Sequence, residues 1–79
     1  MNDGLSATFL FSELTERQRE VALLLAEGLT RAEIAARLSI SRHTVHVHER
    51  DIFDKLGCHC RAKVAALILQ AGLNQPPRK

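Results

Sequence analysis

Residues 34–56, which read IAARLSISRHTVHVHERDIFDKL, decide the fold of this 79-residue chain. Apolar side chains repeat at helical spacing on both sides of residues 39–41, and this Ser-Ile-Ser segment interrupts the repeat. Ser41 is a favourable N-cap for the second helix, because its hydroxyl can accept from the backbone N–H of His43 or Thr44. A short helix, a turn and a longer helix over about residues 42–56 predict a helix-turn-helix, the motif that places its second helix in a DNA major groove.

The two faces of the expected helix over residues 42–56 differ in character. At about 100° per residue, Val45, Ile52 and Leu56 point together into the domain. The opposite face carries His43, His46, Val47 and Arg50. Hydrogen-bond donors and a small apolar side chain are the types that can touch base edges. His48 shares the inner face, so we expect a half-buried structural histidine there and not a ligand.

The composition indicates one small all-α domain and argues against an enzyme. Leu and Ala dominate, and three Phe are the only aromatic residues of the chain. The chain shows no paired-carboxylate site and no nucleophile beside a base, and it is too short to enclose a pocket. We therefore expect no catalytic residues, no cofactor and no metal. The net charge of +2 permits nucleic-acid binding without requiring it.

The sequence also predicts the compartment. The first residues, MNDGLSATFLF, lack the basic start and long apolar segment of a signal peptide, and no apolar run reaches the length of a membrane span. Cys58 and Cys60 are too close in sequence for an unstrained disulfide. We expect a reduced, cytoplasmic protein without a membrane partner.

Helix starts are marked by capping boxes and helix ends by glycine. Thr15 with Gln18 predicts one helix start, and Thr30 with Glu33 predicts the next. A further helix is expected over about residues 61–71. Three helix ends are marked by glycines, namely Gly28, Gly57 and Gly72.

The last expected helix is apolar nearly all round at its centre, VAALIL. A small monomer should not expose such a surface, which suggests a helix-to-helix homodimer. The expected dimer residues are Val64, Leu67, Ile68 and Leu69. The competing interpretation is a wide core face that residues 9–11 partly cover. The domain is expected at residues 14–73, preceded by an arm, a linker remnant or a packed flap at residues 1–13 and followed by a polar tail at residues 74–79.

Many residues at fixed spacing carry a resemblance to a known family. They are Leu14, Thr15, Arg17, Arg19, Glu20 and Val21; Gly28, Thr30, Glu33, Ile34 and Ala35; Leu38, Ile40, Ser41, Thr44, Val45 and His48; and Ile52, Lys55, Leu56, Gly57 and Arg61. In this pattern the chain resembles the LuxR-type (GerE-like) DNA-binding domain. The resemblance implies a four-helix helix-turn-helix domain whose third helix enters the major groove and whose fourth helix forms a homodimer.

The resemblance also implies contacts and partners. The implied base contacts are His46, Val47 and Arg50. The implied phosphate contacts are Thr30, Ser41, His43, Thr44 and Lys55, mostly near two helix N-termini, where backbone N–H groups favour phosphate. The implied partners are double-stranded DNA, a second copy of the chain and RNA polymerase.

Several positions depart from the family pattern. His46 stands where the family commonly has Lys or Arg, and histidine attracts phosphate less. Glu49 takes a position that is often apolar, at the margin of the buried stripe. The charges of residues 42–56 cancel, which weakens the counterion-release contribution to DNA affinity. Cys60 replaces the usual Ser or Thr cap of the last helix, and a thiol is a poor acceptor.

Three other functions compete with a DNA-binding regulator. Cys58, Cys60 and His59 suggest a metal or redox sensor, but they supply three clustered ligands without a fourth. A sigma-factor region 4 shares part of the residue pattern, yet such modules usually stop soon after the Lys-Leu pair. An interaction module that heterodimerises with a full-length regulator would tolerate the neutral recognition helix.

Overall fold

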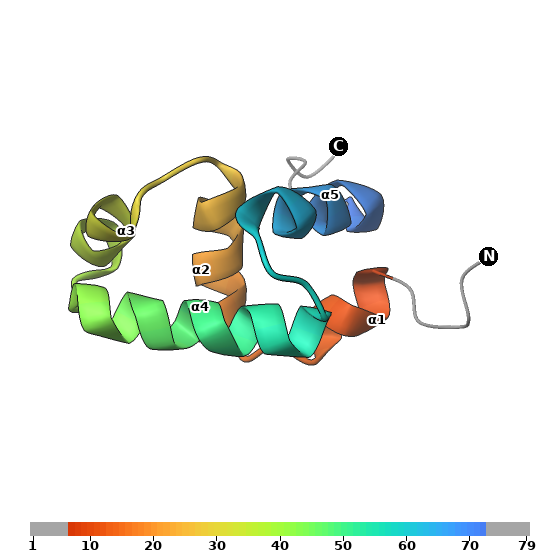
Figure 1. Ribbon diagram of the computed structural model, residues 1–79, viewed down its shortest axis with the longest axis horizontal. Helices are drawn as coiled ribbons and strands as arrows, with labels where there is room; N and C mark the ends of the chain where they lie inside the picture. The colour runs from red at the N-terminus through yellow and green to blue at the C-terminus, as the bar shows by residue number, and fades with distance from the viewer. Residues whose placement is uncertain (1–6, 73–79) are drawn as a thin grey trace, which may run out of the picture.

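The computed structural model describes residues 7–72, which form five α-helices and no strand. The helices are α1 (Ala7–Ser12), α2 (Glu16–Ala26), α3 (Arg31–Leu38), α4 (Arg42–Leu56) and α5 (Arg61–Ala71). Helix α2 packs against α3, α4 and α5, and in Figure 1 it stands between α3 and α5 while α4 runs along one side. The chain is therefore all-α, as the sequence predicts. The expected polar tail at residues 74–79 lies outside the described residues.

The predicted caps fix the starts of α2 and α3. Thr15 accepts from the Gln18 N–H while the Gln18 side chain accepts from the Thr15 N–H. Thr30 and Glu33 form the same reciprocal pair at α3. Each box satisfies two backbone donors that a helix start leaves without partners. Both predicted capping boxes are confirmed.

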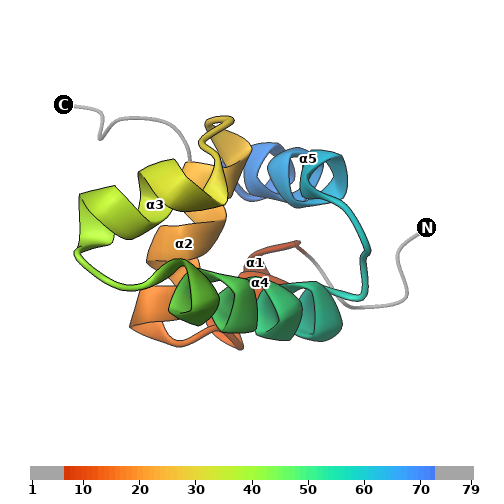
Figure 2. The ribbon, with the colours of Figure 1, turned by 60° about the vertical axis from the view of Figure 1, so that its left-hand side comes forward.

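The turn between α3 and α4 is tight, and a left-handed residue and a helix cap define it. Ser39 ends α3 in the left-handed region, at φ 58°, where a residue with a Cβ is uncommon. Ile40 then donates to the carbonyl of Ala35 at 3.0 Å, and Ser41 caps α4 by accepting from the Thr44 N–H at 3.0 Å. Figure 2 shows the chain reversing direction at this turn, so that the two helices pack on each other.

One apolar core joins all five helices. The largest of its fully buried side chains are Phe11, Val21, Leu25, Ile34, Val45, Ile52, Val64 and Ile68. Each such side chain contributes about 1.5–3 kcal/mol relative to exposure, and the core is mainly aliphatic as the composition predicts. The predicted half-buried position of His48 is confirmed. None of the helices within residues 7–72 has the length and apolar character needed to cross a membrane.

Helix α1 is the element that the expected four-helix count omits. Phe11 is 2% exposed and Leu14 is 4% exposed, so residues before the expected boundary at 14 belong to the core. Helix α1 contacts α4 and α5. Residues 7–12 therefore match one of the three alternatives for residues 1–13, the segment packed on the domain.

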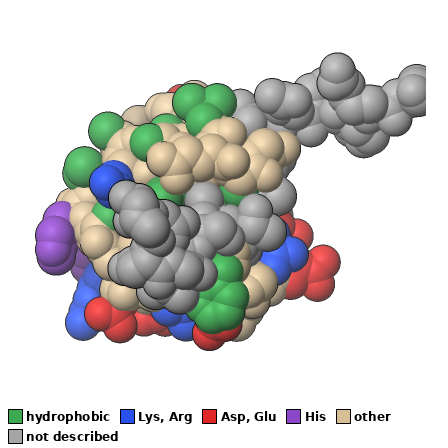
Figure 3. Space-filling view, turned by 90° about the vertical axis from the view of Figure 1, so that its right-hand side faces the viewer, with side chains coloured by type: hydrophobic (Ala, Val, Ile, Leu, Met, Phe, Trp, Pro, Cys, Tyr) green, Lys and Arg blue, Asp and Glu red, His purple; other side chains and the backbone are tan. Residues whose placement is uncertain are grey.

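The same packing corrects the expected dimer residues on α5. Val64, Leu67 and Ile68 are 0%, 9% and 1% exposed, because they face α1, α2 and the rest of the core. Leu69 is 62% exposed and is the one of the four that a second molecule could reach. Figure 3 looks at the end of the molecule that holds α1 and α5, where hydrophobic side chains appear at separate places among other types.

Candidate nucleic-acid interface

A strip of exposed side chains runs along α4 on the face away from the core. His43, Val47 and Arg50 are spaced by four and three residues, so they point the same way, and Asp54 continues the row. We call these four residues the outward strip. Val47 is 39% exposed, which is unusual here for a large apolar side chain. The strip offers a small apolar group and a guanidinium, which are suited to a thymine methyl group and a guanine edge.

His46 lies on the flank of the outward strip and not within it. Its side chain is half-buried, and its Nδ1 atom is buried without a hydrogen-bond partner within residues 7–72. The reason is geometric, because His46 is about 100° around the helix from the fully buried Val45. The expectation that His46 points outward with Val47 and Arg50 is therefore corrected to a position between the core and the strip.

Four of the predicted phosphate-contact residues surround two helix N-termini. Thr30 and Ser41 are exposed and cap α3 and α4. The Ser41 and Thr44 hydroxyl oxygens lie 2.9 Å apart, and Thr44 is half-buried. His43 is exposed in the first turn of α4. The hydroxyls and first-turn N–H groups at these positions are the kind that bind phosphate.

Lys55, the remaining predicted phosphate contact, is exposed, but its ammonium group is engaged in hydrogen bonds within the chain. Its Nζ donates to the Glu13 carbonyl at 3.1 Å and to Gln18 Oε1 at 3.0 Å. Gln18 is buried, and its Nε2 also lies 3.5 Å from Asp51 Oδ2. Lys55 and Asp51 thus anchor α4 to the start of α2, which directs both charges away from the outward strip.

Glu49 is a buried carboxylate that two arginines from other helices neutralise. It is 5% exposed. Arg31 Nε of α3 donates to Glu49 Oε1 at 2.8 Å, and Arg61 Nη2 of α5 lies 4.0 Å from Glu49 Oε2. Arg61 also donates to the carbonyl of Leu29 at 2.5 Å. We call Arg31, Glu49 and Arg61 the arginine–glutamate cluster, and it connects α3, α4 and α5.

The cluster changes the electrostatic expectation for α4. The sequence shows equal numbers of positive and negative side chains over residues 42–56. In the structure Glu49 is buried and paired, and Asp51 contacts Gln18, so neither carboxylate lies on the outward strip. Asp54 remains exposed there beside Arg50. The exposed face of α4 therefore carries a more positive charge than the count over residues 42–56 suggests.

Sequence reasoning identified Glu49 as a departure but missed its partners. A carboxylate on a buried stripe needs a cation, since an unpaired buried charge is costly. A carboxylate at a buried position therefore predicts a cationic partner for Glu49. It does not identify that partner, because Arg31 is eighteen residues away in sequence. Arg31 was not among the predicted contacts, and neither was Arg42, which is exposed at the start of α4.

The cysteine and histidine connector forms no metal-binding group in the described residues. Cys58 is buried, Cys60 is exposed, and both are free thiols. No three His, Cys, Asp or Glu side chains within residues 7–72 are grouped so that they could hold a metal ion. Burial raises the pKa of the Cys58 thiol above its usual range, so this sulfur is a poorer metal ligand than an exposed thiolate. The geometry gives the metal-sensor alternative no support.

A family model supports the helix-turn-helix interpretation. The model described as "Bacterial regulatory proteins, luxR family" matches residues 12–68, which include α2, α3, α4 and the first part of α5. The match covers more than half of the chain and contains both predicted capping boxes and the outward strip.

Curated relatives agree with the family match. The chain is 45% identical over 62 residues to the probable transcriptional regulatory protein SgaR of Hyphomicrobium methylovorum, covering 78% of this chain and 29% of that protein. It is 49% identical over 59 residues to the nitrate/nitrite response regulator protein NarP of Escherichia coli K12, covering 75% and 26%. It is 52% identical over 44 residues to the transcriptional regulatory protein UhpA of the same organism, covering 56% and 22%. The chain spans less than a third of the length of these relatives.

Proposed function

The chain belongs to the luxR family of bacterial regulatory proteins, and we propose that it binds a promoter half-site in double-stranded DNA with α4 in the major groove. One observation carries the proposal most directly. Val47 and Arg50 stand exposed on the face of α4 that points away from the core, while Glu49 is turned inward and paired. This arrangement leaves a surface for reading bases, with the Arg50 guanidinium at its centre. In this role the protein acts in the cytoplasm, with DNA and RNA polymerase as partners.

Arg50 is the proposed specificity residue. Its planar guanidinium can donate two parallel hydrogen bonds to one guanine from a rigid fork of donors, which a lysine lacks. Thr30, Ser41, His43 and Thr44 are the proposed phosphate contacts, which set the register of α4 in the groove. His46 is proposed to touch DNA from the flank. Lys55 can join them with the one N–H that its two internal hydrogen bonds leave over.

The test begins with the wild-type protein and a pool of random duplexes. Enrichment of one sequence class supports specific binding, and the selected site is then used with two variants. Arg50→Ala should lower affinity for the selected site by about 1–3 kcal/mol and relax the preference over random DNA. Arg50→Lys keeps the charge, so it should restore binding to random DNA but not the preference. Equal losses on both DNAs would make Arg50 a phosphate contact, and a folded wild-type protein that selects no duplex would favour an interaction module.

We also propose that the protein binds DNA as a homodimer, in which the two copies contact each other through α5. The support is a short exposed face on this helix, where Ala62, Ala66 and Leu69 are spaced by four and three residues. Two alanines allow a second helix to approach closely, and Leu69 supplies the apolar contact. Two such faces bury less area than a standard stable interface, so the free dimer should be weak and DNA should drive pairing.

The dimer is tested on a duplex with two half-sites. Leu69→Lys should abolish cooperative binding while circular dichroism shows an intact fold, because Leu69 is exposed. Gln70→Lys adds the same charge to the neighbouring exposed position and is the matched control. Cooperative binding that survives Leu69→Lys would exclude this contact, and a one-to-one complex on the selected site would exclude the dimer.

A further inference from the structure

We propose that Arg31 is a DNA-phosphate contact and that buried Glu49 is the residue that positions it. The inference rests on the proposed DNA binding and adds a contact outside the outward strip. It explains why α4 carries a carboxylate on its buried face. Glu49 acts through Arg31 and does not itself meet DNA.

The geometry of Arg31 leaves part of its guanidinium available. The Nε atom donates to Glu49 Oε1 at 2.8 Å, while the Arg31 side chain is 49% exposed and the Glu49 side chain 7% exposed. Within residues 7–72 no hydrogen bond is made by the two Nη groups of Arg31. A planar guanidinium has donors along more than one edge, so the Nε hydrogen bond leaves donors for a second anion. Phosphate is an anion that arginine binds in this way.

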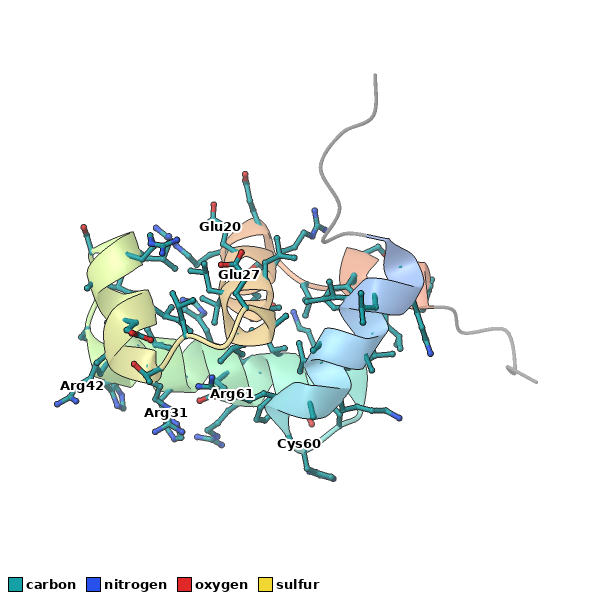
Figure 4. The ribbon with its side chains drawn as sticks, turned by 90° about the horizontal axis from the view of Figure 1, so that it is seen from above. Glu20, Glu27, Arg31, Arg42, Cys60 and Arg61 are labelled. Atoms are coloured by element: carbon teal, nitrogen blue, oxygen red, sulfur yellow. The ribbon has the colours of Figure 1, made fainter. Side chains whose placement is uncertain are left out.

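The position of Arg31 fits the DNA backbone beside the groove. Arg31 is the first residue of α3, and in a helix-turn-helix the first helix crosses the backbone while the second enters the groove. Figure 4 shows that the Arg31 and Arg42 side chains extend past the same edge of the molecule, beside α4. Both residues follow directly after a capping residue, Thr30 or Ser41, that is itself a proposed phosphate contact.

The charge balance of the arginine–glutamate cluster also favours an anion. Arg31 and Arg61 share the single carboxylate of Glu49, so the cluster keeps one net positive charge. Arg61 is further engaged with the Leu29 carbonyl, whereas the Arg31 side chain makes no hydrogen bond in the described part of the chain other than that to Glu49. The excess charge is therefore most available at Arg31.

Stability alone does not account for Glu49. Replacing a buried ion pair by a well-packed apolar residue is often neutral or stabilising, because the desolvation of the charges is avoided. What an apolar residue cannot do is hold Arg31 in one conformation. A side chain that is already ordered loses less entropy when it binds, and this is the advantage that Glu49 gives to Arg31.

The experiment compares two Glu49 variants of equal charge in the full 79-residue chain. Glu49→Gln keeps an oxygen that can accept from Arg31 Nε, and Glu49→Val removes it. Binding to the selected duplex is measured by fluorescence anisotropy over a series of salt concentrations, with thermal unfolding as the check on the fold. Glu49→Val should bind about 2- to 12-fold more weakly than Glu49→Gln, the range expected for ordering one long side chain. In an Arg31→Ala background the two variants should bind equally.

Arg31→Ala gives the second readout. It should weaken binding to all duplexes alike and reduce the slope of log affinity against log salt by about 1, the loss expected for one phosphate contact. An unchanged slope would overturn the proposal, and so would equal binding of Glu49→Val and Glu49→Gln. If Glu49→Val does not fold, the slope of Arg31→Ala decides alone. A wild-type protein that binds no duplex would overturn the proposed function itself, and this inference with it.

Discussion

Helices α4 and α5 differ in what fixes their ends and their faces. Helix α4 begins after Ser41, whose side chain accepts from the Thr44 N–H, whereas α5 begins after Cys60, which makes no side-chain cap hydrogen bond. Helix α4 has separate buried and exposed faces, while the centre of α5 is apolar nearly all round. Helix α4 is therefore specified mainly by its own residues and α5 mainly by distant partners.

Those distant partners can be named. Phe11 of α1 is 2% exposed in the same core as Val64 and Ile68 of α5. Arg61 connects the first turn of α5 to the Leu29 carbonyl and to Glu49. Since α5 has no side-chain cap, these contacts must compensate at its start.

The largest loss of stability is expected from truncating Phe11, the side chain of α1 that packs in the core with α5. Phe11→Ala should lower the free energy of unfolding by about 3–5 kcal/mol, because it leaves a cavity in a small core. Phe9→Ala is the matched control, since Phe9 is 48% exposed on the same helix, and its effect should be much smaller. Chemical denaturation followed by circular dichroism measures both. Equal, small effects would show that α1 adds little to the fold.

The sequence predicts α2 to α5 well for a local reason and α1 poorly for a non-local one. Capping boxes at Thr15 and Thr30 and glycines such as Gly57 mark helix ends within a few residues. Helix α1 has six residues, and its sequence carries neither a capping box nor a glycine at its end. It is held by burying Phe11 against α4 and α5. Which apolar side chains of α5 face inward depends on that packing, so the dimer residues could not be sorted from sequence.

The second prediction concerns the cap of α4. Ser41→Ala removes the acceptor of the Thr44 N–H and should lower the free energy of unfolding by about 1 kcal/mol, within a range of 0.5–2. Cys60→Ala at the start of α5 is the comparison, and its effect should be near zero because no cap hydrogen bond is lost. Thermal unfolding of both variants gives the difference. A loss at Cys60 as large as that at Ser41 would contradict the contrast between the two helices.

The candidate site likewise has features that local sequence predicts and features that depend on residues from other helices. Spacing alone predicts that Val47 and Arg50 share an exposed face of α4, and the structure places them there. Spacing does not predict that Glu49 is paired with Arg31, or that Lys55 is bonded to Glu13 and Gln18, because these partners come from other helices or their junctions. Direct contact of any of these residues with DNA stays a prediction.

The third prediction adds the missing cap to α5. Cys60 has an extended backbone, with φ −151° and ψ 159°, which lies in the region that N-cap residues adopt. Cys60→Ser should therefore raise the free energy of unfolding by up to about 1 kcal/mol, since the hydroxyl can accept from a first-turn N–H. Cys60→Ala provides the control, because it removes the thiol without adding an acceptor. No gain from Cys60→Ser over Cys60→Ala would show that the introduced hydroxyl does not accept from a first-turn N–H of α5.

The smallest effect is expected in the connector between the two helices and depends on pH. Burial, with a smaller contribution from Cys60, raises the pKa of the Cys58 thiol above its ordinary value of 9.0, although Lys63 and a backbone hydrogen bond oppose the change. In the unfolded chain this thiol ionises near 9.0, whereas in the folded chain it stays neutral to higher pH. The unfolded state then binds fewer protons, so the contribution of Cys58 to stability is present below pH 9 and falls as the pH rises through the pKa of Cys58 in the folded chain.

Thermal unfolding from pH 7 to pH 10 should thus show a steeper loss of stability with rising pH for the wild type than for Cys58→Ala. Cys60→Ala should keep most of the wild-type slope, because burial is the largest cause of the raised Cys58 pKa. Identical slopes for wild type and Cys58→Ala would mean that the connector opens enough to hydrate the Cys58 sulfur.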